Sequence, residues 1–108
     1  MKFTHYGTEY DGSLQFDRYA DNNNLAVRLV ADNQPYATLS VNIEGTVLLD
    51  DEFVAKTYSE NEGLCEQLIE AGCFEKTGKV AVVGFAGEQP ILRVLPDSGW
   101  NQWETEAV

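Results

Sequence analysis

The segment that decides the fold class is residues 24–43, which read NLAVRLVADNQPYATLSVNI. Apolar and polar residues alternate on both sides of its centre, and this period of two is typical of strands with one buried face. In residues 36–43, one face carries the apolar side chains of Ala37, Leu39, Val41 and Ile43. The central residues 32–35, DNQP, are typical of a turn. The segment therefore predicts two antiparallel strands, residues 24–31 and 36–43, joined by a short connection.

The chain before this segment continues the same pattern. Residues 13–19 also alternate, with Leu14 and Phe16 on one face, and residues 21–24, DNNN, form a second turn-like stretch. These three strands predict an antiparallel meander. A further strand is expected over residues 52–58.

The apolar period changes after residue 58. Ser59 and Glu62 have the spacing of a capping box, in which the two side chains satisfy backbone N–H groups at a helix start. Gly72 is a helix stop signal, and apolar side chains precede it at helical spacing, namely Leu64, Cys65, Leu68 and Ile69. These features predict one helix over residues 60–71.

The last part of the pattern consists of two more expected strands, residues 79–85 and 91–95. The sequence therefore predicts an α+β fold in a single domain, residues 1–108. We expect a mainly antiparallel sheet of five or six strands, with one helix packed on one face. Residues 96–108 are expected to form a loop-like C-terminal tail.

The charge of the chain excludes several classes of function. Its 108 residues include 18 acidic and 7 basic side chains, which give a formal net charge of -11. Such a charge repels phosphate, so we expect no direct binding to nucleic acid and none to an anionic membrane. The sequence has no apolar run of transmembrane length and no signal peptide at its start, which predicts a cytoplasmic protein.

No catalytic, cofactor or metal-binding motif is present in the sequence. Two cysteines and one histidine are too few for a structural zinc site, so we expect no metal and no cofactor. Cys65 lies on the apolar stripe of the expected helix and should react slowly, whereas Cys73, just after the stop signal, should be more accessible. We expect that the chain is not an enzyme; the weaker alternative is an enzyme that uses His5 or Cys65.

The acidic side chains are unevenly distributed. Residues 32–75 contain ten acidic side chains and one basic side chain, Lys56. Glu62, Glu66 and Glu70 recur every four residues, so the expected helix presents them as a column about 6 Å apart, a spacing comparable to that of neighbouring phosphates. A second acidic group is formed by Asp50, Asp51 and Glu52. We interpret both groups as candidate partner-binding residues; the alternative is a solvated surface that only keeps the protein soluble.

Two tryptophans near the end of the chain, Trp100 and Trp103, form the remaining candidate site. Tryptophan is enriched at the anchors of protein interfaces, so an exposed pair would be a partner-binding site. The alternative is that both side chains fold back onto the sheet, because large aromatic side chains are usually buried.

Two stretches, residues 36–42 (YATLSVN) and 56–63 (KTYSENEG), resemble an uncharacterised family of small acidic proteins carried by bacterial mobile elements. Its members occur on conjugative elements, plasmids and phages, and the resemblance covers roughly residues 14–95. It implies no activity and assigns no role to any residue. What it implies is a mobile-element context, in which small acidic proteins often inhibit host defence, some of them as mimics of DNA.

Charge and resemblance together predict a non-enzymatic protein that binds the basic, nucleic-acid-binding surface of a host protein. Its partner would be a defence nuclease or a restriction or CRISPR complex, which makes it an anti-restriction or anti-CRISPR inhibitor. The alternative is an accessory or structural interaction module in conjugation or regulation, which binds through a sheet edge or through Trp100 and Trp103. For both functions we expect a monomer or a homodimer.

Overall fold

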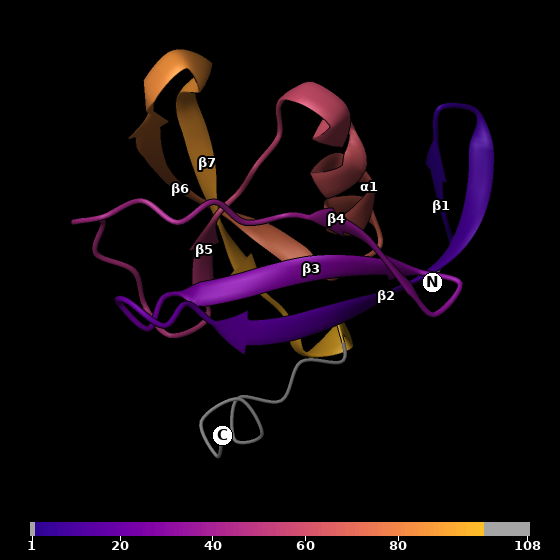
Figure 1. The fold of residues 1–108 in the computed structure, drawn as a ribbon, viewed down its shortest axis with the longest axis horizontal. Helices are drawn as coiled ribbons and strands as arrows, with labels where there is room; N and C mark the ends of the chain where they lie inside the picture. Colours follow the sequence, from indigo (N-terminus) through magenta and orange to yellow (C-terminus); the bar gives the residue numbers. More distant parts are fainter. Residues whose placement is uncertain (1, 99–108) are drawn as a thin grey trace.

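Residues 2–98, the part of the chain described by the computed structural model, form seven strands in two antiparallel sheets (Figure 1). The four-stranded sheet contains, in spatial order, β1 (Lys2–His5), β2 (Thr8–Arg18), β3 (Leu25–Ala31) and β4 (Gln34–Thr38). The three-stranded sheet has the order β5 (Glu52–Val54), β7 (Gly87–Val94), β6 (Phe74–Val83). The predicted α+β class is confirmed, although the strands of this part of the chain number seven and form two sheets.

The meander from β2 to β4 is shaped by turns that contain Asn and Asp. Asn23 adopts a left-handed backbone conformation (φ 62°) between β2 and β3, and Asp32 and Asn33 do so consecutively (φ 51° and 65°) between β3 and β4. Two consecutive residues of this kind form a hairpin turn whose twist matches that of the flanking strands, and Asn and Asp tolerate the conformation better than most residues. The predicted meander of the first half is therefore present.

The predicted strand 36–43 is present only in part, because the chain changes sheets in the middle of it. The backbone N–H of Leu39 donates to the carbonyl of Val27 in the first sheet at 2.8 Å. Two residues later, the N–H of Val41 donates to the carbonyl of Val54 in the second sheet at 2.9 Å. Ser40 lies between them and forms an isolated bridge with Ala55. Residues 39–41 thus connect the two sheets, whereas β4 itself ends at Thr38.

The predicted helix and its capping box are corrected by the structure. A short 3-10 helix, η1 (Ser59–Asn61), comes first, and the α-helix α1 (Leu64–Glu70) begins only after the left-handed Gly63 (φ 85°). Neither helix has a side-chain cap hydrogen bond, and Ser59 itself has a positive φ of 59°. In a continuous helix the Glu60 carbonyl would accept from the N–H four residues later. Here it accepts from the ring Nε2 of His5 at 2.6 Å, so a tertiary contact replaces the helical bond.

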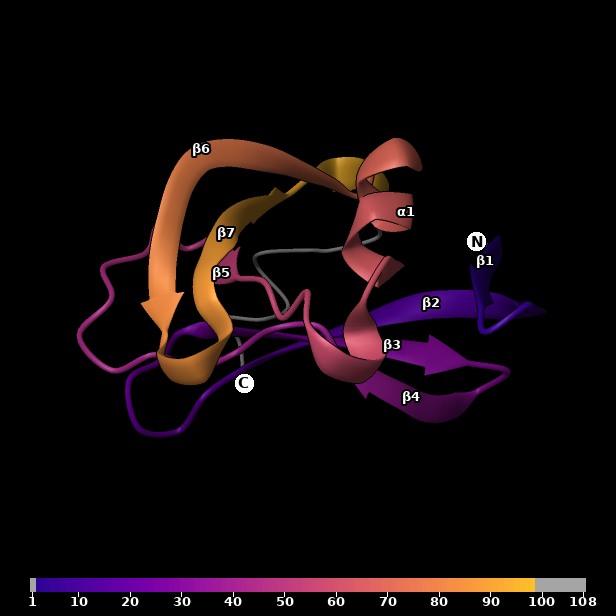
Figure 2. The same cartoon turned by 90° about the horizontal axis from the view of Figure 1, so that it is seen from above.

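The main core lies between the two sheets and α1. Phe53 and Phe74 meet edge to face with ring centroids 5.0 Å apart, and Leu29, Leu64 and Leu68 are buried in the same cluster. A smaller cluster consists of Val54, Ala81, Val83 and Ile91, against which Val41, Ile43 and Leu48 pack. Seen from above, α1 stands beside the first part of the strongly curved β6 (Figure 2). Within residues 2–98, no helix is long and apolar enough to cross a membrane.

Candidate interaction surfaces

The acidic column predicted on the helix is shorter than expected. Glu62 precedes α1 in an extended conformation (φ -53°, ψ 126°), so only Glu66 and Glu70 are held one helical turn apart. All three glutamates are exposed, whereas Leu64, Cys65 and Leu68 form the buried side of α1. The two helical glutamates therefore face away from the core, and Glu62 adds a third carboxylate from the preceding turn.

The second predicted acidic group, Asp50, Asp51 and Glu52, is divided by the structure. Asp50 is exposed, Asp51 is half-buried with its carboxylate 3.5 Å from Arg93, and Glu52 is 1% exposed. Glu52 accepts a hydrogen bond from the backbone N–H of Leu49 (2.9 Å) and forms an ion pair with Lys79 (2.8 Å). A buried, paired carboxylate cannot contact a partner, so Glu52 is removed from the predicted binding residues.

The electrostatic state of Glu52 follows from two opposing effects. Burial favours the neutral acid, but the hydrogen bond from Leu49 and the interaction with Lys79, with a smaller contribution from Arg93, outweigh it. The pKa of Glu52 is therefore below its ordinary value. Its charge is used inside the fold, where it links the start of β5 to Lys79, in the stretch between Lys76 and Val80 where the register of β6 with β7 shifts.

The predicted Trp100 and Trp103 site lies outside the described residues.

Most of the basic side chains are neutralised within the protein. Four of the seven basic side chains form ion pairs within residues 2–98, namely Arg28 with Asp17 (3.8 Å), Lys56 with Glu60 (2.8 Å), Lys79 with Glu52 (2.8 Å), and Arg93 with Asp51 (3.5 Å) and Glu75 (2.9 Å). In the same part of the chain, Glu62, Glu66 and Glu70 form no ion pair. The three carboxylates around α1 therefore have no ion-pair partner within the described fold.

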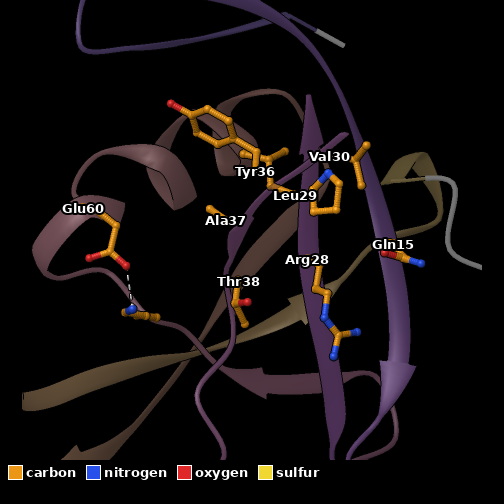
Figure 3. Close-up of a pocket in the computed structure, with 10 residues that line it drawn as sticks. Gln15, Arg28, Leu29, Val30, Tyr36, Ala37, Thr38 and Glu60 are labelled. Carbon is orange, nitrogen blue, oxygen red and sulfur yellow. Dashed lines mark hydrogen bonds and ion pairs between the residues drawn. The ribbon is translucent and has the colours of Figure 1, made fainter. Parts of the chain in front are cut away.

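A pocket of about 280 Å³ with a mixed polar and apolar lining lies along β4 (Figure 3). Strand register aligns Gln15, Arg28 and Thr38 across its floor, and Lys56 and Glu60 lie on its other side. Hydrogen bonds from Lys56, from Ser59 and from the backbone lower the pKa of Glu60 to about 2. Both basic side chains of the pocket, Arg28 and Lys56, are paired with carboxylates. Sequence patterns did not reveal the pocket, because its residues come from four separate segments.

His5, the histidine of the weaker enzymatic alternative, is used to hold the N-terminal strand in place. Its Nε2 donates to the Glu60 carbonyl, so in the neutral ring Nδ1 accepts from the hydroxyl of Tyr36. Burial, followed by the hydrogen bond and charge interaction with Tyr10, raises the pKa of Tyr36. Both ring nitrogens of this buried histidine are engaged, as expected of a structural residue.

The two cysteines are both buried. Desolvation, with a smaller effect of Glu66, raises the pKa of Cys65 to about 12, so its nucleophilic thiolate is scarce at neutral pH. The prediction that Cys65 is buried is confirmed. The prediction that Cys73 is more accessible is wrong, because the side chain is only 4% exposed and belongs to the main core.

A third surface, which sequence analysis missed, is apolar. Val80 and Val82 on β6 are 54% and 69% exposed, and Phe85 in the following 3-10 helix, η2 (Gly84–Ala86), is 94% exposed. Beside β6 lies a pocket of about 290 Å³, which Cys65 and Ile69 of α1 help to line. The signal in the sequence is the apolar run 80–85, which lies within the predicted strand 79–85.

These features define the class of the chain as an acidic α+β protein with a surface of unpaired glutamates and an exposed apolar sheet edge. Comparisons of the chain with family models, with curated proteins and with solved structures found no significant match.

Proposed function

We propose that this chain is a non-enzymatic acidic binding protein that occupies a basic, nucleic-acid-binding surface of a partner protein. The observation that carries the proposal is the uneven pairing of charge. The basic side chains are largely paired inside the fold, whereas Glu62, Glu66 and Glu70 are exposed and form no ion pair within residues 2–98. A basic partner surface would supply the missing positive charge.

The placement of these glutamates works against the helix that carries them. Like charges at positions i and i+4 destabilise a helix by roughly 0.2–0.5 kcal/mol. Glu70 is also the last residue of α1, where the helix dipole disfavours negative charge, and no basic residue lies in the last turn. A charge arrangement that is unfavourable in the free protein supports a role in a complex, where a cationic surface would remove the repulsion.

The class of partner follows from the chemistry of the surface and from the family resemblance. A protein that normally binds nucleic acid presents lysines and arginines spaced to meet phosphates. Glu66 and Glu70 stand about 6 Å apart along the helix axis. This spacing is similar to that of phosphates along a strand, and Glu62 extends the surface. The resemblance to proteins of mobile elements favours a host defence nuclease, or a restriction or CRISPR complex, as the partner.

Competition with nucleic acid tests this proposal directly. A panel of nucleases and restriction proteins would be loaded with labelled duplex, and release of the duplex would be followed as the chain is added. We expect displacement by the wild-type chain for at least one member, and displacement should weaken as salt rises, because salt screens charged contacts. The proposal is refuted if no member of the panel shows salt-sensitive displacement.

A matched pair of variants separates a specific acidic surface from total charge. The test variant replaces Glu62, Glu66 and Glu70 with Gln. The control variant changes the charge equally but elsewhere, by replacing Glu9 and Glu88 with Gln and Asp32 with Asn, all of which are exposed. We expect the test variant to bind at least about tenfold more weakly, or about 1.4 kcal/mol, and the control to bind nearly as well as the parent. Equal losses in both variants would mean that only net charge matters.

A second candidate function is an accessory interaction module that binds through a sheet edge. The exposed side chains of Val80 and Val82 on β6, an edge strand of the three-stranded sheet, favour this alternative. Binding through these apolar contacts would persist at high salt, because salt does not screen them. Salt dependence therefore distinguishes the two candidates.

A further inference from the structure

The two sheets together have four edge strands, and contacts within the fold cover three of them. At β1, the side-chain amide of Gln67 bonds both backbone groups of Thr4, at 2.8 Å and 2.7 Å. At β4, Asn61 donates to the carbonyl of Thr38 at 2.5 Å. At β5, the N–H of Val41 donates to the carbonyl of Val54 at 2.9 Å. Within residues 2–98, β6 has no corresponding contact on its outer side.

The strand pairing shows which backbone groups of β6 point outward. Val80 lies opposite Pro90 of β7, and the Pro90 carbonyl accepts from Ala55 on the β5 side at 2.9 Å. In an antiparallel pair, the N–H and C=O of one residue point to the same side, so Pro90 and Val80 do not bond each other. The N–H and C=O of Val80 therefore point to the open edge. Because this direction alternates along a strand, those of Val82 point there as well.

The side chains at this edge are unusually apolar for an exposed strand. Val80, Val82 and Phe85 make up half of the six large hydrophobic side chains that are exposed in the described part of the chain. Val80 also lines the pocket between α1 and β6, whose other walls include Ile69 and Leu92. Natural edge strands usually carry charge, proline or a covering segment, which prevents pairing with another chain. The β6 edge lacks these features over residues 80–83.

The charge of the segment that contains β6 favours a second copy of this chain as the partner of the open edge. Residues 76–87, KTGKVAVVGFAG, contain no acidic residue and two lysines, although the whole chain carries a net charge of -11. Two acidic copies repel each other, and β6 adds no negative charge to this repulsion, because Lys79 is paired with Glu52 and residues 80–87 carry no charge. We propose that β6 is a self-association edge, which pairs antiparallel with β6 of a second copy and joins the two three-stranded sheets.

The outward backbone groups restrict the register of such a pairing, and the register that opposes Val80 to Val82 joins the two exposed valines of each copy. A two-fold axis at Ala81 places Val80 opposite the partner's Val82, and Val82 opposite the partner's Val80. Both residues of each pair have outward N–H and C=O groups, so they exchange hydrogen bonds as a regular antiparallel ladder requires. The same axis places the valine side chains of the two copies next to each other. It places each Lys79 opposite Val83 of the second copy, so no lysine lies opposite another lysine. A symmetric, self-complementary contact of this kind closes as a dimer instead of continuing as a fibre.

Sedimentation equilibrium of the full chain over a range of protein concentration tests the proposal. We expect reversible dimer formation that strengthens as salt rises, because salt screens the repulsion between two acidic copies. Val82→Glu places a negative charge at the edge and should weaken dimer formation at least about tenfold, or about 1.4 kcal/mol. Val47→Glu is the matched control, because Val47 is 89% exposed on another segment and the charge change is equal. This control should have a much smaller effect.

Amide hydrogen exchange provides a readout that does not depend on any variant. The amides of Val80 and Val82 should be protected at high protein concentration and should exchange rapidly on dilution. Circular dichroism and thermal unfolding would establish that the two variants remain folded. The proposal is overturned by a monomeric mass at every concentration, by equal effects of the two variants, or by an edge that pairs only with a different protein. None of these outcomes affects the acidic-surface proposal, which predicts the opposite salt dependence.

Discussion

Removal of the Lys79 ammonium group should reveal how strongly the buried Glu52 carboxylate depends on it. Lys79 lies 2.8 Å from the Glu52 carboxylate, whose side chain is 1% exposed, whereas the lysine side chain is 50% exposed. Removal of one partner from a fully buried pair costs about 3–5 kcal/mol. Since solvent reaches the lysine side, we expect Lys79→Met to lower the free energy of unfolding by about 2 kcal/mol. The bond from Leu49 remains and limits the loss.

Urea unfolding of a double-mutant cycle measures this interaction. The cycle compares Lys79→Met, Glu52→Gln and the double variant, in which no charge is left uncompensated. We expect the double variant to be more stable than Lys79→Met alone, by about 1 kcal/mol, because Gln can still accept from the backbone N–H of Leu49. Strict additivity of the two single changes would refute this account of the pair.

The pH dependence of the same variants gives a second check. The pKa of Glu52 is lowered in the folded state, so its charge stabilises the fold. This contribution is complete above the ordinary glutamate pKa of about 4.3 and is lost as the pH falls through the lower pKa of the folded state. The stability of Glu52→Gln should therefore fall less steeply than that of the parent in this acidic range. Partner binding should be unchanged in Glu52→Gln, because the residue is buried.

The remaining predictions concern the surface, the thiols and nucleic acid. Glu70→Gln should raise the free energy of unfolding by about 0.5–1 kcal/mol at low salt, because it removes the repulsion with Glu66 and an unfavourable charge at the helix end. Urea unfolding at high salt should show a smaller gain, because salt screens both effects. Lys56→Met should raise the pKa of Glu60 from about 2 toward its ordinary value, as an NMR titration would record. Cys65 should be labelled only as the protein unfolds, and rapid labelling of the native protein would contradict its burial. A gel shift should detect no submicromolar binding of duplex DNA or RNA.

The meander from β2 to β4 could be predicted because its determinants are local. Alternation of apolar residues identified these strands, and the Asn and Asp residues at 21–24 and 32–33 supplied the left-handed turn positions. β1 (Lys2–His5) and the first residues of β2 were not predicted. The change of sheet at Leu39 to Val41 could not be predicted in this way. A residue keeps its apolar or polar character when its backbone partner changes, so alternation contains no information about which sheet receives the next hydrogen bond.

The acidic sites show a second limit of sequence reasoning. The pattern from Ser59 to Glu62 satisfied the capping-box rule. In the structure, however, the Glu60 carbonyl accepts a hydrogen bond from His5, which is distant in sequence. Likewise, Asp50, Asp51 and Glu52 are equivalent as charges in the sequence. Their roles differ because the strand turns Glu52 toward Lys79, while Asp50 stays exposed. Local patterns identify where charge is concentrated, whereas tertiary contacts decide which charges remain available.

The two proposed surfaces meet at Glu66, which links them physically. This glutamate belongs to the exposed acidic face of α1 and also lines the pocket beside Val80. Its charge attracts a basic partner, but it adds to the repulsion that a second copy must overcome when it approaches β6. Exposed charges interact over about 10 Å, the Debye length at 0.1 M salt, and over longer distances at lower ionic strength. Both effects of Glu66 are therefore strong at low salt. Glu66→Gln should therefore weaken displacement of nucleic acid from a partner and strengthen dimer formation in the same preparation. A change of both in the same direction would show that a single surface serves both interactions.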